Sequence, residues 1–195
     1  MSHIIGVSIR MLFVLTFVCG LIYPLAVTGI SQVLFPRQAN GSMVYDQEGE
    51  PVGSALLGQG FQGSQYFHPR PSAAGDDGYD ATSSAGTNLG PTSGKLLDSV
   101  KNQAETFRQD NGLPADAEVP ADAVTSSASG LDPHISLESA FLQVQRVAQA
   151  RNLKEEEVMK LVYQYAEGRT LGFLGEPRVN VLKLNMALDG EQTGS

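Results

Sequence analysis

The chain has 195 residues, a mass of 20.8 kDa and a formal net charge of -8, with 42% hydrophobic and 17% charged residues. This length suits one domain of ordinary size, and the apolar content excludes a disordered chain. The acidic balance removes the counterion release that drives nucleic-acid binding, so we expect no nucleic-acid partner. A single cysteine, Cys19, excludes a disulfide framework and a cysteine-based zinc site.

The first feature along the chain is an apolar stretch. No charged residue occurs from Met11 to Pro36, and a helix of about 25 such residues is about 37 Å long, enough to cross the hydrocarbon core of a bilayer. A cleaved secretory signal is the alternative, but its apolar core runs about 7–15 residues, and here apolar residues continue beyond the small residues at 26–28. The sequence therefore predicts a transmembrane helix over residues 11–36.

Two residues that would stop a soluble helix lie inside this stretch. Pro24 and Gly29 are tolerated in membrane helices, where neighbouring helices or side chains satisfy the freed backbone groups. They indicate a helix that packs against other helices.

The orientation of the predicted span follows from charge. Arg10 and the amino terminus flank one end and Arg37 flanks the other, and the positive-inside rule favours residues 1–10 as a cytoplasmic tail. Residues 38–195 carry all 21 acidic and 11 of the 13 basic residues, a net charge of -10 that anionic cytoplasmic lipid would repel. We therefore expect residues 37–195 on the outer side of the membrane.

The sequence pattern of the outer region predicts a small α+β domain. Strand-like runs at 43–45 and 51–54 bracket a polar turn. The segment 67–94 is rich in Gly, Pro, Ser and Asp, yet it is longer than a compact domain usually leaves unstructured. We expect an ordered loop there, pinned by the side chains of Tyr66, Phe67, Tyr79 and Leu89.

Three helical patterns follow this loop. The first has Leu96, Leu97, Val100, Ala104 and Phe107 at helix-face spacing. The second runs from about 137 to 151 and is capped by Ser136. The third has Val158, Leu161, Val162 and Tyr165 on its inward side, and Asn152 stands three residues before Glu155, as in a capping box.

The chain closes with RVNVLKLNMAL, in which Leu182, Leu184, Met186 and Leu188 alternate with other residues. This period of two predicts a half-buried strand.

Three patterns bear on chemistry. Residues 58–63 match G-x-G-x-x-G, but no helix opens after them, so a turn is the preferred interpretation over a phosphate-binding loop. His68, His134 and Asp132, with serines such as Ser127 and Ser129, supply the residue types of a hydrolase, although no G-x-S-x-G elbow is present. Asp76, Asp77 and Asp80 would form a solvated acidic loop rather than a cation site. We expect neither catalytic nor metal-ligating residues.

Five motifs in one order carry a resemblance. They are GSALLGQGFQGSQYFHPRPSA, YDATSSAGTNLGPTS, VTSSASGLDPHIS, QVQRVAQARNL and GEPRVNVLKLNMALD. Together they resemble the C subunit of the bacterial potassium-transporting Kdp ATPase, and Tyr23-Pro24 is similar to a Tyr-Pro pair in that family's single membrane helix. The resemblance runs from about Ile9 to Leu188.

The resemblance implies an accessory, non-catalytic subunit of a high-affinity, ATP-driven potassium uptake complex in the bacterial inner membrane. Its implied partners are a potassium-channel-like subunit, a P-type ATPase subunit that hydrolyses ATP, and membrane lipid. The family is described as supporting assembly and as a catalytic chaperone that raises ATP affinity. Because a periplasmic domain cannot reach a cytoplasmic nucleotide site, we expect ATP and K⁺ to act at the level of the complex.

The resemblance also points to loop and membrane-helix residues. In the helix they are Tyr23, Pro24 and Gly29. In the loops they are Gly58, Gln59, Arg70, Pro71, Ser72, Gly86, Asn88, Leu89, Gly90, Gly130 and Asp132. We expect the glycines to serve turns with positive φ or close backbone approach, and Asn88 and Asp132 to hydrogen-bond loop backbone.

Gln59 is the single candidate for nucleotide contact, against a role as a buried loop amide. For Arg70, Arg146, Arg151 and Arg178, pairing inside the domain is preferred over contact with a partner subunit. Two other functions remain as alternatives: a membrane-anchored periplasmic hydrolase and a stand-alone binding module.

Overall fold

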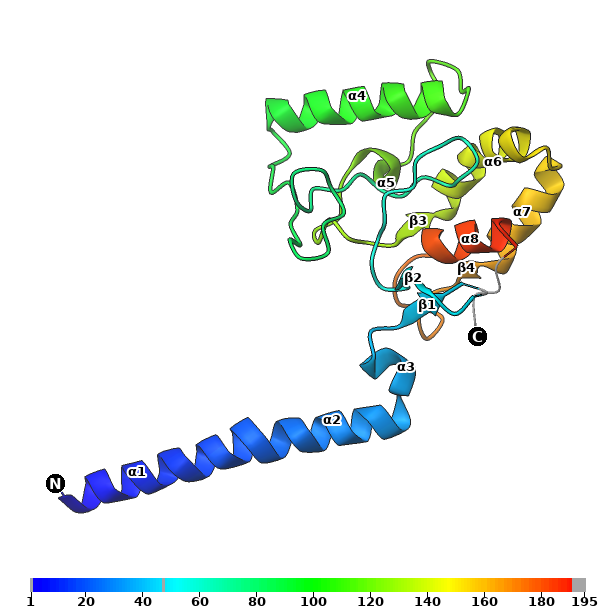
Figure 1. Ribbon diagram of the computed structural model, residues 1–195. Coiled ribbons are helices and arrows are strands. Elements are labelled where there is room, and N and C mark those ends of the chain that lie inside the picture. Colours follow the sequence, from blue (N-terminus) through cyan, green and yellow to red (C-terminus); the bar gives the residue numbers. More distant parts are fainter. Residues whose placement is uncertain (1, 47, 191–195) are drawn as a thin grey trace. The chain divides into compact units, whose positions relative to one another are not determined.

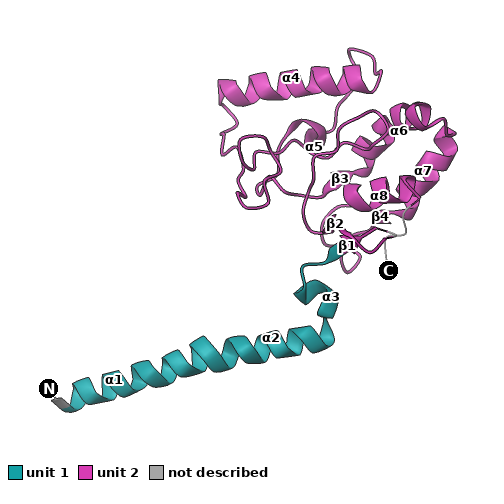
Figure 2. Cartoon of the chain, in the orientation of Figure 1, with its two compact units in different colours: residues 1–43 teal, residues 44–195 magenta. Residues whose placement is uncertain are grey.

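The computed structural model describes residues 2–46 and 48–190 (Figure 1). The chain divides into two compact units, residues 1–43 and residues 44–195 (Figure 2). The first unit is helical and the second is a small α+β unit with two small sheets.

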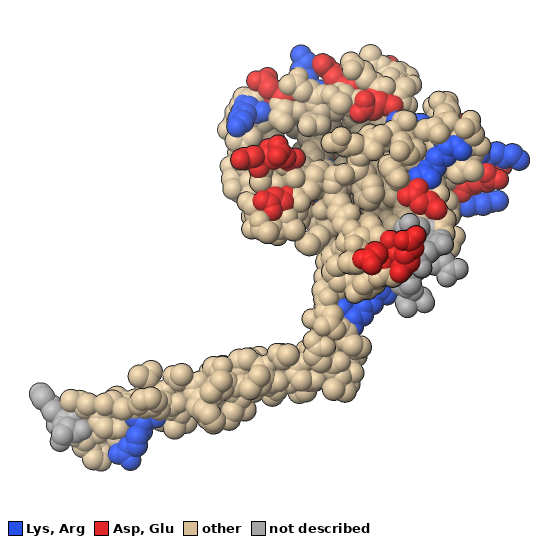
Figure 3. Space-filling view, viewed as in Figure 1, with Lys and Arg blue, Asp and Glu red and all other residues tan. Residues whose placement is uncertain are grey.

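The first unit is dominated by one long helix. Its segments are α1 (Ser2–Phe17), the π-helical turn η1 (Val18–Ile22) and α2 (Tyr23–Leu34), followed by the short α3 (Pro36–Ala39). From His3 to Leu34 the helix has 32 residues, and its length and composition suit a membrane span. Figure 3 shows this helix almost free of charged side chains. The predicted single apolar N-terminal helix is therefore present.

The π-helical turn explains how Pro24 fits inside this helix. Proline has no N–H, and in an α-helix its ring would clash with the carbonyl four residues earlier, that of Gly20. Here the Tyr23 N–H donates to the Val18 carbonyl, which adds one residue to the turn just before the proline. A Cβ placed on Gly29 would meet nothing within 4 Å, so this position leaves open space on the helix surface.

The described strands form two small sheets. They are β1 (Met43–Tyr45), β2 (Pro51–Ser54), β3 (His134–Ser136), β4 (Ala166–Glu167) and β5 (Arg178–Asn180). β1 pairs with β2, as the sequence predicted, and the other sheet has the order β3-β5-β4. Ile135 and Ala166 both lie opposite Val179, which places the centre of this sheet in the core.

Five helices complete the described part of the unit: α4 (Gly94–Asp110), α5 (Ala121–Val124), α6 (Leu137–Arg151), α7 (Glu155–Gln164) and α8 (Val181–Leu188). The prediction for α6 is confirmed, and the Ser136 hydroxyl accepts the Ser139 N–H at 3.0 Å as its cap. Helix α4 is also confirmed, although Leu97 is 60% exposed and the rest of its apolar stripe is only half-buried.

The predicted start of α7 is displaced by two residues. Asn152 adopts a left-handed conformation with φ 55° and ends α6 instead. The N-cap is Lys154, whose N–H donates to the Glu157 carboxylate at 3.3 Å. The acidic first turn therefore caps its own helix.

The core lies where α6, α7 and α8 pack on the three-stranded sheet. Its fully buried members include Phe67, Ile135, Val147, Val158, Val162, Val179 and Leu184. A smaller cluster joins Val44 and Ala55 to Leu182 and Met186 of α8.

The predicted closing strand is wrong beyond Asn180. Residues 181–188 form a helix, because the Asn180 side chain accepts the Lys183 N–H at 3.1 Å and caps it. This helix buries Val181, Leu182, Leu184, Asn185 and Met186 and leaves Lys183 partly exposed. Most of its residues are apolar, so the alternation of leucines along it does not distinguish a strand from a largely buried helix.

Candidate functional site: the motif loops

The motif loops, here residues 58–72, 86–90 and 130–132, are joined at glycines. The Gly58 N–H donates to the Leu131 carbonyl at 2.7 Å, and a Cβ on Gly58 would lie 2.8 Å from the Asp132 carbonyl oxygen. A Cβ on Gly86 would lie 2.9 Å from the Ala128 carbonyl oxygen.

The closest crossing is at Gly130. This residue has φ +70°, and a Cβ would overlap the Ala85 carbonyl oxygen. The close backbone approach expected at Gly58, Gly86 and Gly130 is therefore present. Gly90 differs, because a Cβ there would meet nothing within 4 Å.

Ser72 connects two of the motif loops. Its hydroxyl donates to the Gly130 carbonyl at 2.6 Å and accepts the N–H groups of Ala74 and Tyr79. The Tyr79 hydroxyl donates in turn to the Arg70 carbonyl at 2.7 Å, and burial raises the pKa of Tyr79 to about 12. The predicted ordered loop is thus held by its own side chains, with Pro71 half-buried between these contacts.

Asp132 organises the third motif loop. Its carboxylate lies 3.1 Å from the Arg70 guanidinium, accepts the His134 N–H at 3.0 Å and faces His134 Nδ1 at 3.1 Å. Burial raises the pKa of Asp132, but the hydrogen bonds from His134 and the His134 and Arg70 charges outweigh burial, so the pKa lies below its usual range.

This geometry does not assemble the hydrolase triad considered from sequence. The other nitrogen of His134, Nε2, lies 3.6 Å from the Glu167 carboxylate. The hydroxyls of Ser127 and Ser129 lie 3.3 Å from each other, and Ser129 accepts the Leu131 N–H. His134 is therefore held between two carboxylates, and these serines stabilise the loop backbone.

A buried cation, Arg146 of α6, holds the first motif loop. It is 8% exposed, and its Nη1 donates to the Ser64 and Tyr66 carbonyls, both at 2.8 Å. Its Nε donates to Asn111 at 2.9 Å and its Nη2 to Gln143 at 2.8 Å. Burial lowers the pKa of Arg146 to about 10.

The partners of Arg146 were missed from sequence, because backbone carbonyls leave no pattern in the chain. The available signal was the pair Gln143 and Arg146, two polar residues one helical turn apart on the side of α6 that carries Val144 and Val147. The other three arginines considered in the sequence analysis pair with carboxylates inside the unit: Arg70 with Asp132, Arg151 with Asp189 and Arg178 with Glu167.

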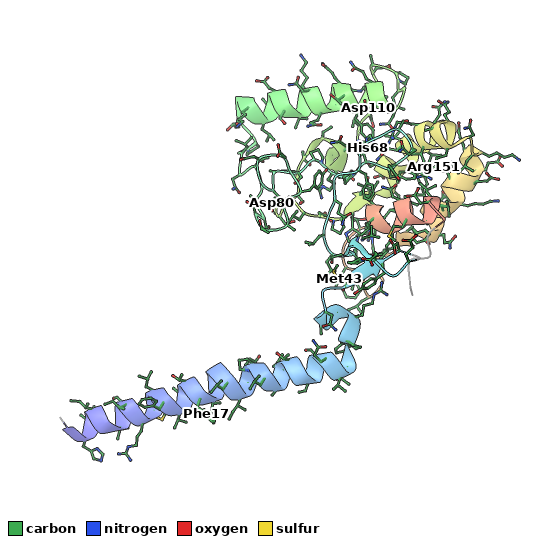
Figure 4. The ribbon with its side chains drawn as sticks, viewed as in Figure 1. Phe17, Met43, His68, Asp80, Asp110 and Arg151 are labelled. Atoms are coloured by element: carbon green, nitrogen blue, oxygen red, sulfur yellow. The ribbon has the colours of Figure 1, made fainter. Side chains whose placement is uncertain are left out.

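His68 lies beside this arginine. The His68 N–H donates to Gln143 at 2.7 Å, and the ring Nε2 lies 3.0 Å from the Gly63 carbonyl and 3.4 Å from Arg146. Burial lowers the pKa of His68, and the Arg146 charge lowers it further. Figure 4 shows His68 near the end of α4 that carries Asp110.

A cleft of about 580 Å³ opens between α4 and the loop of residues 60–79. Phe61, His68 and Tyr79 line it from the loop, and Phe107 and Asp110 line it from α4.

Gln59 is used within the fold. Its side-chain amide donates to the Val52 carbonyl at 3.2 Å and occupies the space that a side chain on Gly53 would need. The residues after Gly63 form a bend and a turn, not the helix that a phosphate-binding loop requires. This geometry favours the interpretation as a structural loop amide.

The remaining motif residues lie nearer the surface. Asn88 is exposed with φ 51°, a conformation that asparagine tolerates well, and Leu89 is half-buried. Asp80 accepts both the N–H and the hydroxyl of Thr82, and these hydrogen bonds lower its pKa. Asp76 and Asp77 are exposed to solvent.

Fold and site together define a small α+β protein with a long apolar helix and with loops that are joined by hydrogen bonds and close backbone approaches. Over residues 5–190 the chain matches the family model described as K⁺-transporting ATPase, c chain, KdpC. The chain therefore belongs to the KdpC family.

Curated relatives agree with this family. The potassium-transporting ATPase KdpC subunit of Mycobacterium tuberculosis strain H37Rv is 54% identical over 182 residues, covering 93% of this chain and 95% of the relative. The KdpC subunit of Myxococcus xanthus is 56% identical over 182 residues, with 93% and 85% covered. The KdpC subunit of Koribacter versatilis is 50% identical over 186 residues, with 95% and 93% covered.

Proposed function

We propose that this chain is the accessory, non-catalytic subunit of a potassium-transporting ATPase complex, and that ATP is hydrolysed on another chain. The observation that carries the proposal is the match to KdpC subunits over almost the whole chain. Its proposed partners are a potassium-channel-like subunit and a P-type ATPase subunit. Its proposed role is to support the assembly and stability of the complex.

The contacts within the motif loops support a scaffold role. Gln59, Ser72 and Asp132 all hydrogen-bond backbone groups of the chain itself. Gly58 and Gly130 permit close backbone crossings. Residues used in this way hold a surface in one shape, which is what a subunit that must fit its partners requires.

The apolar helix supports a bacterial inner-membrane location. In our proposal the chain crosses the membrane over residues 11–36, with residues 1–10 in the cytoplasm and residues 37–195 in the periplasm. A periplasmic domain does not meet ATP, so any effect on the ATP affinity of the catalytic subunit would pass through the membrane helix and the partner subunits. On this topology Gln59 does not contact nucleotide.

The direct test is recovery of the partners. Tagged full-length protein is purified in mild detergent from membranes of its native cell grown at limiting potassium. We expect a channel-like chain and a P-type ATPase chain to co-purify, with ATP hydrolysis that K⁺ stimulates. Recovery of this chain alone, with no such activity, would overturn the proposal.

A second test addresses packing of the membrane helix. A Gly29→Leu side chain has open space within this chain, so it would clash only with a neighbouring helix. We expect it to reduce recovery of the partner chains, whereas Val27→Leu, on the opposite side of the helix, should not. Equal recovery from both variants would remove Gly29 from the packing surface.

A further inference from the structure

An ordered turn with an apolar tip connects β4 to β5. Thr170 and Leu174 exchange two backbone hydrogen bonds of 2.9 Å, and Arg169 pairs with Glu176 at 2.6 Å across the base. We call residues 169–176 the apolar tip. These contacts join the two sides of the apolar tip.

The side chains of the apolar tip face solvent. Leu171 is 79% exposed, Phe173 is 69% exposed and Leu174 is 49% exposed. The first two are the most exposed large apolar side chains among the described residues of the second unit. A cluster of this kind on a stably folded surface marks a contact with another molecule.

The backbone conformation at Leu171 supports the interpretation that the apolar tip contacts another molecule. Its φ is 55°, in the left-handed region, where leucine costs about 1 kcal/mol more than glycine and where asparagine is better tolerated. Leu171 is the most exposed large apolar side chain among the described residues of the second unit, so burial within the chain does not offset the strain. We therefore expect the Leu171 side chain to make its stabilising contacts with another molecule.

We propose that the apolar tip docks into an apolar pocket on another subunit of the K⁺-transporting ATPase complex. The inference rests on the proposed function, since it needs a partner subunit. Interface centres combine buried aromatic and aliphatic anchors with a charged rim, which is the arrangement of Leu171 and Phe173 above the Arg169–Glu176 pair.

Charge favours a protein partner over a lipid surface. Loops that bind membranes carry unpaired Lys and Arg beside their apolar residues. The only cation of the apolar tip, Arg169, is neutralised by Glu176, and residues 38–195 have a net charge of -10. The apolar tip therefore lacks attraction to anionic headgroups.

Photo-crosslinking in the full-length chain tests the docking. Benzoylphenylalanine replaces Phe173 in one variant and Tyr163 of α7, 61% exposed, in a matched control. After irradiation of native membranes, we expect Phe173 to link to another protein subunit and the Tyr163 position to remain unlinked.

The other outcomes are distinguishable. Linkage to lipid alone, or no linkage although the partner chains co-purify, would overturn docking of the apolar tip and leave the proposed function standing. Failure of any partner chain to co-purify would overturn the proposed function itself.

Substitutions supply a measurement that does not depend on the probe. Leu171→Asn keeps a residue that tolerates the left-handed backbone but removes the apolar contact. We expect about tenfold less partner chain to be recovered at an unchanged thermal midpoint, the size of a modest interface anchor. The control Leu97→Asn, exposed on α4, should leave recovery unchanged. Unchanged recovery from Leu171→Asn combined with Phe173→Ser would count against the docking.

Discussion

Replacing single glycines by alanine separates two reasons why a position in the loops requires glycine: a positive φ and the close approach of another backbone segment. Gly130 has both a positive φ of +70° and a Cβ position that overlaps a backbone oxygen. Gly58 has only the close approach, with a carbonyl oxygen 2.8 Å from the Cβ position. Gly112 has only the positive φ, +63°, with nothing within 4 Å, and Gly90 has neither. The four variants therefore form a matched set.

The expected free energies of unfolding follow from these terms. Alanine restricts the unfolded chain and stabilises by about 0.4–1 kcal/mol where its backbone fits. A left-handed alanine costs about 1–2 kcal/mol, and crowding against backbone costs about 1–3 kcal/mol. We therefore expect Gly90→Ala to stabilise slightly, Gly112→Ala to destabilise by about 1 kcal/mol, Gly58→Ala by about 2 kcal/mol and Gly130→Ala by about 3 kcal/mol.

The assay is thermal unfolding of the full-length protein in mild detergent. The chain has six Tyr and no Trp, so near-ultraviolet circular dichroism of tyrosine reports on the folded loops. At about 2–4 °C per kcal/mol, Gly130→Ala should lower the midpoint by roughly 6–12 °C. A midpoint for Gly90→Ala as low as that for Gly130→Ala would refute the reasoning, because it would show that neither backbone angle nor proximity sets the effect.

Three further outcomes are expected. Arg146→Met leaves buried carbonyl groups without their donor, so urea unfolding should show a loss of about 3 kcal/mol or more, while the surface variant Arg169→Met should change stability by less than about 1 kcal/mol. Burial lowers the pKa of His68 below 6.5 in the folded state, so the unfolded chain takes up a proton first as the pH drops. The free energy of unfolding should therefore fall as the pH drops from 6.5 through the lower pKa of the folded state. His68→Gln should remove that part of the pH dependence in urea titrations at several pH values. Asn180→Ala removes the cap of α8 and a buried bond to the Ala55 carbonyl, so hydrogen exchange of α8 should accelerate at a cost of at least about 1 kcal/mol, and unchanged protection would argue against the cap.

Local signals predicted the elements whose cause is local. Helix α6 begins after Ser136 because a serine hydroxyl caps the helix that follows it, and that information lies within a few residues. The β1–β2 pairing is similar, since its two runs flank one turn. The strand predicted over 181–188 failed because a short, mostly apolar run is compatible with a strand and with a buried helix, and the burial of α8 comes from the rest of the domain.

The site was predicted in part for the same reason. Close backbone approach was expected at Gly58 and Gly130, but not which segments approach, because Gly58 meets Asp132 and Gly130 meets Ala85 across long stretches of chain. The carbonyl partners of Arg146 could not be predicted from the sequence, because every residue type supplies a backbone carbonyl.

The crossings at Gly58, Gly86 and Gly130 also bear on the order of folding. Helices α6 and α7 are neighbours in the chain and meet through short-range contacts, which form early. The joined loops need three separate segments to come together, and each closure loses chain entropy before the hydrogen bonds between the segments can form. The motif surface therefore depends on contacts between distant parts of the chain, and because Phe67 of the first motif loop lies in the core, completing the core requires that loop to be in place.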